Sequence, residues 1–382
     1  MLDNPSFALF EDYLIMANLL TLFFVIMSCF KLGVYGLSMN YYLFSCPFVD
    51  SVVKNDVNKA LQDDPTLAAG LVRMHFHDCF IEGCDGSVLI DSTKENTAEK
   101  DSPANLSLKG YKVIDDIKLE LEKQCPGVVS CADILAMAAR DAVFFAGGPV
   151  YNIPKGRKDG TRSKIEDTFN LPPPFFNVSQ LIRMFGQHGF SPKDMVALSG
   201  NNCALINISI NVIVRFRTKI DRQKDAVINT LLWWDPIFMR RRGIDLINNS
   251  VGIRIKGAHT LGAARCVSFK ERLTQLDQTL DSEFAKTLSK TCNIGDNAEQ
   301  PFDATRNDFD NSYFNSLVSN NGVLTSDQTL YNSAQTRNIV NMYAMNQALF
   351  FLDFQQAMVK MSLLDVKEGS KGEVRKNCHK IN

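Results

Sequence analysis

The chain has 382 residues, of which 45% are hydrophobic, so it is long enough to bury a large core as one domain or as two lobes. Its formal net charge is −1 and no basic stripe dominates, which argues against a nucleic-acid partner. Its ten cysteines do not form the repeated pairs of a zinc domain and instead favour disulfides in an oxidising compartment.

The N-terminal residues are typical of a secretory signal. An apolar run from Leu19 to Ile26 is followed by a passable cleavage site at Gly36, so residues 1–36 are predicted to be a signal region. A membrane anchor is the alternative, but the apolar stretch is at the short limit for a span. Residues 1–15 carry acidic side chains where a signal needs positive charge, and Met16 is a more ordinary start, which makes residues 1–15 a candidate untranslated stretch.

The next segment carries the densest chemistry of the chain. A helix is predicted to begin at Asp64-Pro65, a typical cap and first position, and to continue through Phe76 on helical apolar spacing. Arg73 and His77 are four residues apart, so they share a face of this helix and can point into one pocket. His75 lies on another face.

A tight loop follows directly. Cys79 and Cys84 are near enough in sequence to close it, and Asp78, Asp85 and Ser87 cluster around it.

The rest of the chain favours a mainly α fold, because helical periodicity recurs and strand-like alternation is scarce. A loop is predicted over residues 147–161 and a rigid, extended segment over residues 171–176. The further predicted helices, in chain order, are Asp115–Cys125, Cys131–Ala146, Val178–Gly189, Pro192–Ser199 with Ser191 as its cap, Asn311–Val318 and Thr336–Leu364.

Residues 201–256 differ in kind from the remainder. They include both tryptophans, no Glu, and ten Lys or Arg against four Asp, without a sustained helical period. This composition predicts a surface loop or a poorly ordered segment.

Several motifs together resemble one family. Residues 73–80 (RMHFHDCF) resemble the distal-haem signature of the secretory plant (class III) haem peroxidases, and residues 196–200 joined to residues 258–262 resemble the proximal-haem signature. Further motifs that occur in family order are Val129–Ile134, Gly156–Asp159 and Ser326–Gln328. The resemblance covers Tyr41 to Cys378 apart from the inserted stretch. It implies a two-lobed haem peroxidase fold over residues 37–382, with haem b between a distal and a proximal lobe.

On the distal side, the resemblance assigns the residues that meet hydrogen peroxide. His77 would be the base that moves the peroxide proton, and Arg73 the cation that stabilises developing charge. Asn105 would fix the His77 tautomer by accepting from its other nitrogen, which also makes the Asn105 glycosylation sequon an unused one. Phe76 and Arg73 would contact the haem.

On the proximal side, the resemblance implies that His259 is the axial iron ligand and that Asp327 accepts its second N–H, making the imidazole more electron-rich. Pro172 would contact aromatic donors at the haem edge. Phe175 and Phe176 either line that channel or pack in the core.

Two calcium ions are also implied. The first would be held by Asp78, Ile81, Gly83, Asp85 and Ser87, with Ile81 and Gly83 contributing carbonyls. The second would be held by Thr260, Asp303, Thr305 and Asp310, although the Asp303–Thr305 spacing is one residue shorter than in many relatives. Acidic, solvated loops are the alternative for both sets.

Family order also sorts eight of the cysteines into pairs. The implied disulfides are Cys46–Cys125, Cys79–Cys84, Cys131–Cys378 and Cys266–Cys292. Cys29 falls in the signal region and Cys203 in the insertion, so both odd cysteines lie outside the domain.

The insertion is atypical for this family. Excising the 57 residues 201–257 restores the sequence Leu-Ser-Gly-Ala-His-Thr, which suggests a retained intron or an error in the gene model. A tolerated loop is the alternative, since added loop length alone costs only about 0.6 kcal/mol per doubling.

The resulting expectation is a secreted, monomeric haem peroxidase without a stable membrane span. It would reduce hydrogen peroxide and oxidise small phenolic donors by one-electron steps, outside the cell rather than in the vacuole. Two alternatives remain. One is a peroxidase-like protein whose haem binding is impaired by the insertion, and the other is a disulfide-linked binding protein in which His75, His77 and Asp78 hold zinc.

Overall fold

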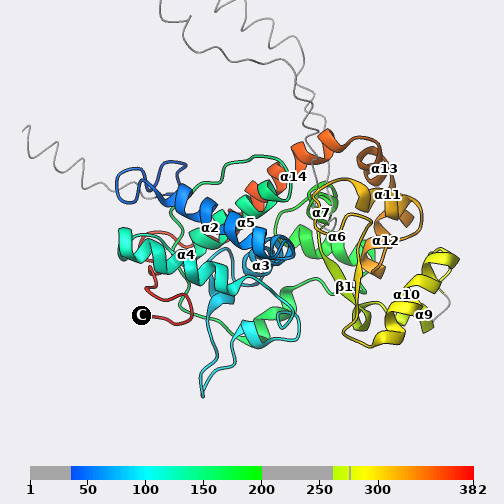
Figure 1. Ribbon diagram of the computed structural model, residues 1–382, viewed down its shortest axis with the longest axis horizontal. Coiled ribbons are helices and arrows are strands. Elements are labelled where there is room, and N and C mark those ends of the chain that lie inside the picture. The colour runs from blue at the N-terminus through cyan, green and yellow to red at the C-terminus, as the bar shows by residue number, and fades with distance from the viewer. Residues whose placement is uncertain (1–35, 200–260, 275–276) are drawn as a thin grey trace, which may run out of the picture. The chain divides into compact units, whose positions relative to one another are not determined.

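The protein is described by a computed structural model that places residues 36–199, 261–274 and 277–382 (Figure 1). Most of these residues are helical, which confirms the predicted fold class. The signal region up to residue 35 and the inserted residues 201–257 lie outside the described residues. Within the described ranges, no helix has both the length and the apolar character needed to cross a membrane.

The chain divides into two compact units. The first comprises the described residues up to Phe145, then Val150–Pro173 and Met358–Asn382. The second comprises Ala146–Pro149 and the described part of Pro174–Ala357.

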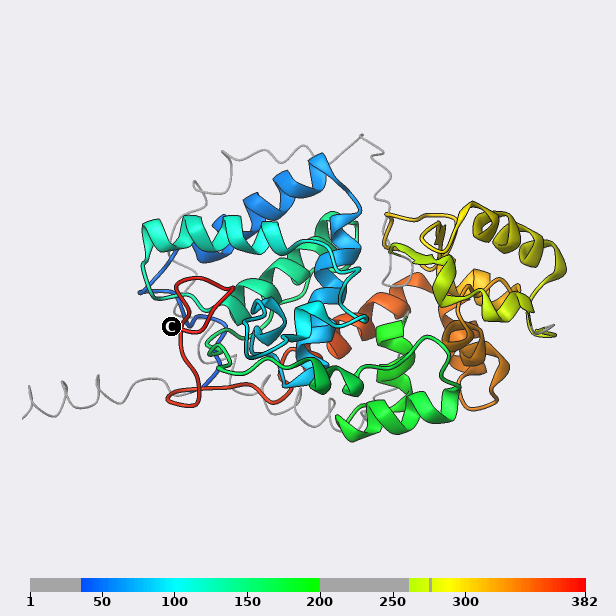
Figure 2. The same cartoon turned by 90° about the horizontal axis from the view of Figure 1, so that it is seen from below.

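The first unit is organised around one buried helix. Its helices are α2 (Val49–Asp63), α3 (Leu67–Ile81), α4 (Tyr111–Gln124) and α5 (Cys131–Phe145). Helix α5 packs against the other three, and α2 also lies along α4 (Figure 2). Alanines such as Ala136 and Ala139 are fully buried on α5, and their small side chains allow the neighbouring helices to approach closely.

Two helices of this unit begin elsewhere than predicted. Helix α4 begins at Tyr111, four residues before the predicted start, and buries Val113, Ile117 and Leu121 as a single stripe. Helix α3 begins at Leu67, because Asp64 Oδ1 accepts hydrogen bonds from the Thr66 amide at 2.9 Å and the Thr66 hydroxyl at 2.7 Å. Asp64 therefore closes a turn before the helix.

Three short 3-10 helices hold the loops next to α3. They are η1 (Ser87–Leu89), η2 (Glu99–Asp101) and η3 (Ile165–Asn170). Helix α3 contacts η1 and η3, and η2 contacts both η1 and η3. These contacts bring the loop after α3 and the segment around Asn105 to the same side of the helix.

A buried ion pair fixes the segment that follows α5. Arg157 Nη1 lies 2.8 Å from Asp133 Oδ1, and both side chains are fully buried. The Tyr42 hydroxyl donates to Asp133 Oδ2 at 2.7 Å, and Arg157 Nε donates to the Ser362 carbonyl at 3.0 Å. A buried pair is tolerated when its remaining donors and acceptors are satisfied in this way.

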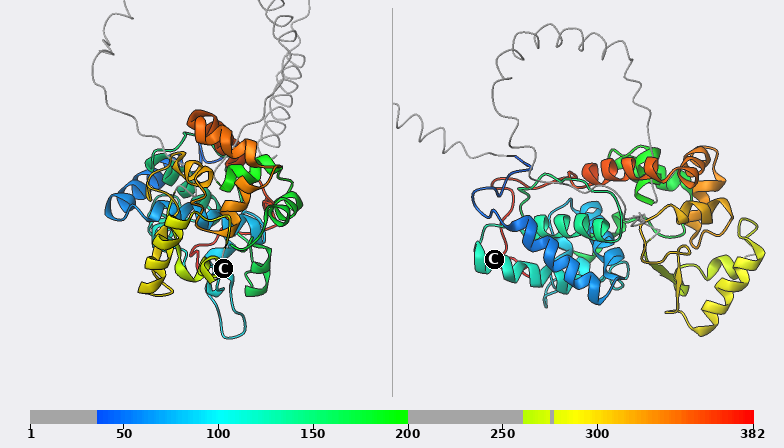
Figure 3. Two further views of the ribbon diagram at one scale, coloured as in Figure 1. Left: turned by 90° about the vertical axis from the view of Figure 1, so that its right-hand side faces the viewer. Right: turned by 45° about the horizontal axis from the view of Figure 1, so that its top comes forward.

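The four disulfides implied by the family order are all present. Three belong to the first unit, namely Cys46–Cys125, Cys79–Cys84 and Cys131–Cys378, and Cys266–Cys292 belongs to the second. The bridge that ends at Cys378 keeps the C-terminal end beside α4, as Figures 1 and 3 both show. In the chain-entropy view a bridge contributes more the longer the loop it closes, from about 2 kcal/mol for Cys79–Cys84, with a separation of 5 residues, to about 5 kcal/mol for Cys131–Cys378, with a separation of 247.

The second unit contains shorter elements. They are α6 (Val178–Gln187), α7 (Pro192–Ser199), β1 (Ala263–Arg265), η5 (Cys266–Ser268), α9 (Glu271–Thr274), α10 (Ser282–Ile294), β2 (Glu299–Pro301), α11 (Ser312–Val318), α12 (Thr325–Asn332), α13 (Arg337–Met345) and most of α14 (Gln347–Met361). The strands pair antiparallel, with Ala264 opposite Gln300. Phe309, Phe314 and Phe350 pack as an aromatic cluster with ring centroids 5.3 to 5.8 Å apart.

The predicted helix Thr336–Leu364 is in fact two helices. Asn346 interrupts it, because its backbone is extended and its side-chain oxygen accepts a hydrogen bond from the Leu349 amide at 3.0 Å. Asn346 thereby caps α14, a role that asparagine fills readily. Ser191 caps α7 as predicted, with its hydroxyl accepting from the Asp194 amide at 3.0 Å.

Candidate active site

Helix α3 brings an arginine and a histidine together on one face. Arg73 Nε donates a hydrogen bond to His77 Nε2 at 3.2 Å, which is possible because residues four apart in a helix are neighbours on its surface. His77 is buried, whereas Arg73 is exposed. The Arg73 guanidinium also donates to the Ser107 hydroxyl and to the Ala104 carbonyl, each at 2.8 Å. Its position is therefore set by both the helix and the 104–107 loop.

Asn105 determines which nitrogen of His77 carries the proton. Asn105 Nδ2 donates to the Glu99 carbonyl at 2.8 Å, so its Oδ1 is the atom that faces His77 Nδ1, at 2.6 Å. An amide oxygen only accepts, and therefore Nδ1 must be the protonated nitrogen. Nε2 then carries the lone pair, which agrees with the donation from Arg73 Nε.

The surroundings of His77 keep its imidazole neutral. Burial and the nearby Arg73 charge lower the pKa of His77 from 6.5 to about 3, against a smaller opposing effect of the hydrogen bond to Asn105. At neutral pH the ring is thus a free base with its lone pair on Nε2. A neutral base beside a guanidinium can take a proton from a bound molecule while the cation stabilises the charge that develops.

Phe76, the expected haem contact, lies half-buried on the same helix. Its ring packs on Phe80 with centroids 4.3 Å apart and meets the His77 ring edge-on at 5.8 Å. It therefore adds an apolar surface next to the polar pair.

The asparagine sequon at residue 105 is not available for glycosylation in this fold. Asn105 is 1% exposed, and both ends of its amide are hydrogen-bonded within the protein. Attaching a glycan to Nδ2 would require breaking these bonds and exposing the side chain.

The loop after α3 gathers buried carboxylates. Asp78 accepts from the Gly86 and Val88 amides at 3.0 and 3.3 Å, and Asp85 Oδ1 accepts from the Ser87 amide at 3.0 Å. Asp78, Asp85 and Ser87 are each at most 1% exposed. The positive φ of 70° at Gly86 allows the sharp turn that folds the loop back on itself.

Glu99 adds a third buried carboxylate, which the sequence reasoning did not identify as functional. Its Oε2 accepts from the Ser87 hydroxyl at 3.3 Å, and its buried Oε1 has no hydrogen-bond partner within the described ranges. Its carbonyl oxygen is the acceptor that orients Asn105. An isolated glutamate in a polar loop carries no sequence signal that would have distinguished it.

The charges of this loop fit a bound divalent cation. Burial and Asp85 raise the pKa of Asp78 to about 8, and burial together with Asp78 and Asp85 raises the pKa of Glu99 to about 9. A cation among these oxygens would stabilise the charged carboxylates. Gly83, an expected carbonyl ligand, has φ 96° and lies within the loop, and Ile81 is the last residue of α3.

The expected proximal residues fall partly outside the described chain. His259 and Thr260 lie outside the described residues. Asp327 is buried on α12, where its Oδ2 accepts from the Leu324 amide at 2.9 Å and its Oδ1 accepts from the Tyr313 hydroxyl at 3.1 Å. Burial and Asp327 raise the pKa of Tyr313 well above its usual value, so its hydroxyl stays protonated and donates to Asp327.

The residues expected to hold the second calcium ion are less buried than those of the first: Asp303, Thr305 and Asp310 are each half-buried. Asp303 Oδ1 accepts from the Thr305 amide at 2.8 Å and from its hydroxyl at 3.1 Å, so these two residues are in contact. Asp310 instead accepts from the Ser312 amide at 2.7 Å, at the start of α11. Asp303 and Thr305 are therefore in contact, whereas Asp310 lies just before the N-terminus of α11.

Pro172, the expected donor contact, is half-buried in the extended segment after η3. Phe175 is 64% exposed, and Phe176 lies edge-on to it with ring centroids 5.9 Å apart. Phe175 is therefore not a core residue.

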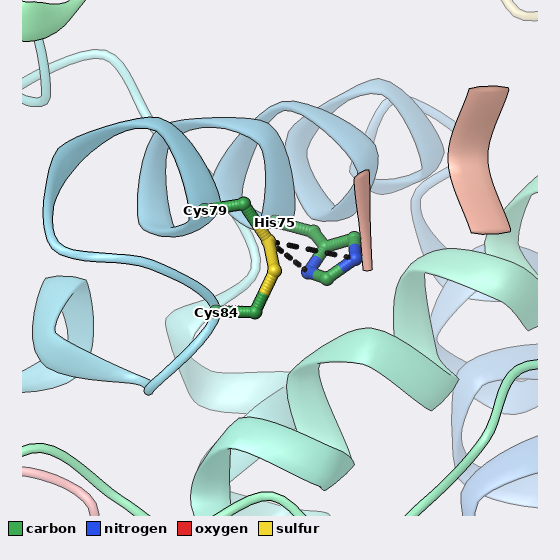
Figure 4. A group of neighbouring side chains, drawn as sticks. All are labelled: His75, Cys79 and Cys84. Carbon is green, nitrogen blue, oxygen red and sulfur yellow. Dashed lines mark hydrogen bonds between the residues drawn. A yellow bond between two sulfur atoms is a disulfide. The ribbon is translucent and has the colours of Figure 1, made fainter. Parts of the chain in front are cut away.

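A zinc site formed by His75, His77 and Asp78 is not supported. These residues do not form a metal-binding group in the described part of the chain, because His77 faces Asn105 while His75 faces the Cys79–Cys84 disulfide. Figure 4 shows His75 against this disulfide, with its Nδ1 3.6 Å from Cys79 Sγ. Both sulfurs are bonded to each other and are not thiolates, the form in which cysteine binds zinc.

Comparisons with known proteins agree on one family. A sequence model of the family described as Peroxidase matches residues 53–230 and 250–346. Peroxidase 47 of Arabidopsis thaliana is 62% identical over 347 residues, covering 91% of this chain and 89% of the relative. Peroxidase 64 of the same plant is 39% identical over 374 residues, covering 96% and 99%. Peroxidase P7 of Brassica rapa subsp. rapa is 37% identical over 353 residues, covering 91% and 100%.

Proposed function

This chain belongs to the plant (class III) peroxidase family and is a haem peroxidase, and we propose that Arg73, His77 and Asn105 perform its reaction with hydrogen peroxide. The support is the hydrogen-bonded series from Arg73 through His77 to Asn105. It presents one basic nitrogen and one cation side by side.

The proposed proton movement follows from this geometry. His77 Nε2 takes a proton from one peroxide oxygen and returns it to the other, which leaves as water. Asn105 holds the Nδ1 proton throughout, so the ring cannot present the wrong nitrogen. Arg73 stabilises the negative charge that develops as the O–O bond breaks. A haem held at this site would supply the redox chemistry of the reaction.

We propose that Arg73 and Phe76 contact the haem on the distal side and that His259 is the ligand of its iron. The neutral, buried base next to an exposed guanidinium fits a peroxide-binding haem pocket. Asp327 would accept the second N–H of His259 while Tyr313 holds its other oxygen. Such an arrangement would orient the imidazole of His259 and raise its basicity.

Small phenolic donors are the proposed reductants. Two donor molecules each give up one electron and one proton, so that one peroxide yields two waters and two phenoxyl radicals. We place their contact near Pro172, which lies half-buried in the extended segment after η3.

Two calcium ions are proposed as structural cofactors. The first is assigned to Asp78, Asp85 and Ser87 with the Ile81 and Gly83 carbonyls, and the buried charge of this loop supports it. The second is assigned to Thr260, Asp303, Thr305 and Asp310. Because Asp78 follows His77 directly, the first ion would also hold the base in position.

We further propose a monomer that is secreted to the cell exterior rather than to the vacuole. Four disulfides support an oxidising compartment. Residues 1–36 are proposed to be the signal region and residues 201–257 an insertion foreign to the domain. Sequencing the transcript across Gly200–Ala258 tests the last point, because a spliced message lacking the stretch identifies it as a retained intron.

The experiment that tests the proposed function uses the purified protein with haem and calcium. We expect a Soret band and peroxide-dependent oxidation of a phenolic donor such as guaiacol. Turnover should be lost in His77→Gln while the Soret band remains. A protein without haem after refolding with calcium would contradict the proposal.

A further inference from the structure

The C-terminal segment Leu364–Gly372 closes over the loop that follows α3. The Cys84 amide donates to the Leu364 carbonyl at 3.0 Å, and the Lys158 amide donates to the Lys367 carbonyl at 2.7 Å. At Gly83, an added Cβ would lie 2.6 Å from the Asp365 carbonyl oxygen, so the two backbones are in direct contact. Both segments belong to the first unit.

One side chain of this segment reaches the carboxylates of the loop. The Lys367 ammonium forms an ion pair with Asp85 Oδ2 and also donates to the Glu82 carbonyl at 3.2 Å. Asp85 is almost completely buried, whereas the Lys367 side chain is 27% exposed. The lysine thus reaches in from the surface.

The two oxygens of Asp85 are divided between different partners. Oδ1 accepts from the Ser87 amide inside the loop, and Oδ2 faces Lys367 and Gly160. An added Cβ on Gly160 would overlap Asp85 Oδ2, so this side of the carboxylate has no room to turn away. The ion pair with Lys367 therefore fixes the orientation in which Oδ1 points into the loop.

The charge balance gives this ion pair a further role. Asp78, Asp85 and Glu99 place three carboxylates in a buried region, where uncompensated negative charge is costly. Arg375 contributes a guanidinium that donates to the Gly86 carbonyl at 2.6 Å. The Lys367 ammonium, by contrast, pairs directly with one of the three carboxylates, that of Asp85.

We propose that Lys367 is a built-in cation of this loop, which holds Asp85 in place and makes the fold around His77 less dependent on calcium. The proposal rests on the assignment of the first calcium site under the proposed function. Removing the Lys367 charge destabilises the loop when calcium is scarce. It also removes a positive charge near the ion, so calcium binds more tightly. Both effects enlarge the stabilisation that calcium provides.

The test compares the thermal midpoint of the haem-containing protein with a calcium chelator and with millimolar calcium. Lys367→Met keeps the apolar stem and removes the charge. In chelator, we expect its midpoint to fall about 2 to 4 °C below that of the wild type, with most of the difference removed by calcium. Calorimetric titration should show calcium binding about threefold or more tighter than in the wild type.

Two controls separate this ion pair from general charge effects. Lys371→Met removes an exposed lysine of the same segment, and Lys367→Arg keeps the charge at the site. Both should behave as the wild type does. If Lys367→Met can be purified only with calcium present, while Lys371→Met can be purified without it, the proposal is supported.

The outcomes that overturn the proposal are distinct from a failure of the proposed function. Equal midpoints of Lys367→Met and the wild type in chelator would overturn it, and so would equal losses in Lys367→Met and Lys371→Met. If instead the wild-type protein shows neither binding heat nor any gain in midpoint with calcium, the assignment of the calcium site itself fails, and this inference fails with it.

Discussion

Asn105 Oδ1 lies 2.6 Å from His77 Nδ1, and the Asn105 amide is itself held by the Glu99 carbonyl. Because Asn105 accepts from Nδ1, the proton of the neutral imidazole is on Nδ1 and Nε2 is the nitrogen that acts as the base. This contact joins two residues that are 28 positions apart in the chain, and it depends on η2, which contains Glu99 and contacts η1 and η3.

Replacing Asn105 tests the tautomer argument. Asn105→Ala removes the acceptor, so the Nδ1 proton is no longer held and part of the protein presents the wrong nitrogen. We expect the second-order rate constant for peroxide to fall about 10- to 100-fold, a loss comparable to that caused by removing the hydrogen-bond partner of a metal-bound histidine. Stopped-flow absorbance in the Soret region measures it. An unchanged rate constant would show that the tautomer is fixed by other means.

The pH profile of the same rate constant follows from the lowered pKa of His77. Because this pKa is about 3, the base stays neutral across the usual range, and the rate should be flat down to about pH 4 and fall below it. Asn105→Asp places a carboxylate against Nδ1 and stabilises the protonated ring, so its acid limb should move to higher pH. A limb that moves to lower pH would contradict the electrostatic account.

Two other histidines should affect stability with opposite signs. Burial and Arg157 lower the pKa of His75 to about 3, so between pH 6.5 and 3 the unfolded chain binds a proton that the folded chain does not. Stability therefore falls as pH falls through this window, by up to about 1.4 kcal/mol per pH unit. His75→Gln should reduce this slope in urea unfolding with the disulfides intact.

His379 provides the matched comparison. Burial lowers its pKa, but hydrogen bonds to Asp91 and Asp115 outweigh this and raise the pKa above 6.5. Its contribution to stability is fully present below pH 6.5 and is lost as pH rises through the folded pKa. His379→Gln should therefore lower stability at acidic pH and leave it unchanged at high pH. If the free energy of unfolding depends on pH in the same way in His75→Gln and in His379→Gln, the environments assigned to these two histidines are wrong.

Tyr313 is expected to influence the reduction potential of the haem iron through Asp327. Its hydroxyl donates to Asp327, and this donation reduces the electron density of the carboxylate. In Tyr313→Phe the carboxylate should accept more strongly from the axial imidazole, which lowers the reduction potential of the haem iron. Spectroelectrochemical titration measures this potential. A potential that rises, with an intact Soret band, would argue against Asp327 as the partner of the axial ligand.

Removing the inserted stretch tests whether it belongs to the functional enzyme. A variant in which Gly200 is joined directly to Ala258 restores the spacing of the proximal signature. We expect it to bind more haem per protein than the full chain, since small displacements near an axial ligand are costly to a catalytic site. Haem-to-protein absorbance ratios measure the difference, and a lower ratio in the shortened variant would favour a genuine loop.

Local sequence signals predicted part of this structure well. Spacing placed Arg73 and His77 on one face of a helix, and the Ser191 cap and the mainly α class also follow from local patterns. The break at Asn346 was missed because apolar periodicity continues across it. The start of α4 was predicted at Asp115, although Val113 already belongs to its buried stripe. At Asn346 a single backbone conformation, rather than a change of pattern, decides where the helix ends.

The tertiary relationships required more than local pattern. Apart from Cys79–Cys84, which are close in sequence, the disulfide pairs were expected only because of the family resemblance, since spacing alone allows many pairings. The Asn105 contact was likewise expected only from the resemblance. Glu99 and Lys367 were missed because neither lies in a motif, and each becomes significant only where the fold buries carboxylates from distant segments. The Lys367–Asp85 pair joins residues 282 positions apart.

The central claim is that His77 is the base of the peroxide reaction, and His75 offers a matched control two residues away. Both histidines are buried on α3 with the pKa lowered to about 3, but His75 faces the Cys79–Cys84 disulfide. In stopped-flow reactions of the haem-containing protein with hydrogen peroxide, His77→Gln should lower the second-order rate constant by about 100- to 10,000-fold, whereas His75→Gln should leave it within about twofold of the wild type. Equal losses in the two variants, or a wild-type rate in His77→Gln, would contradict the account.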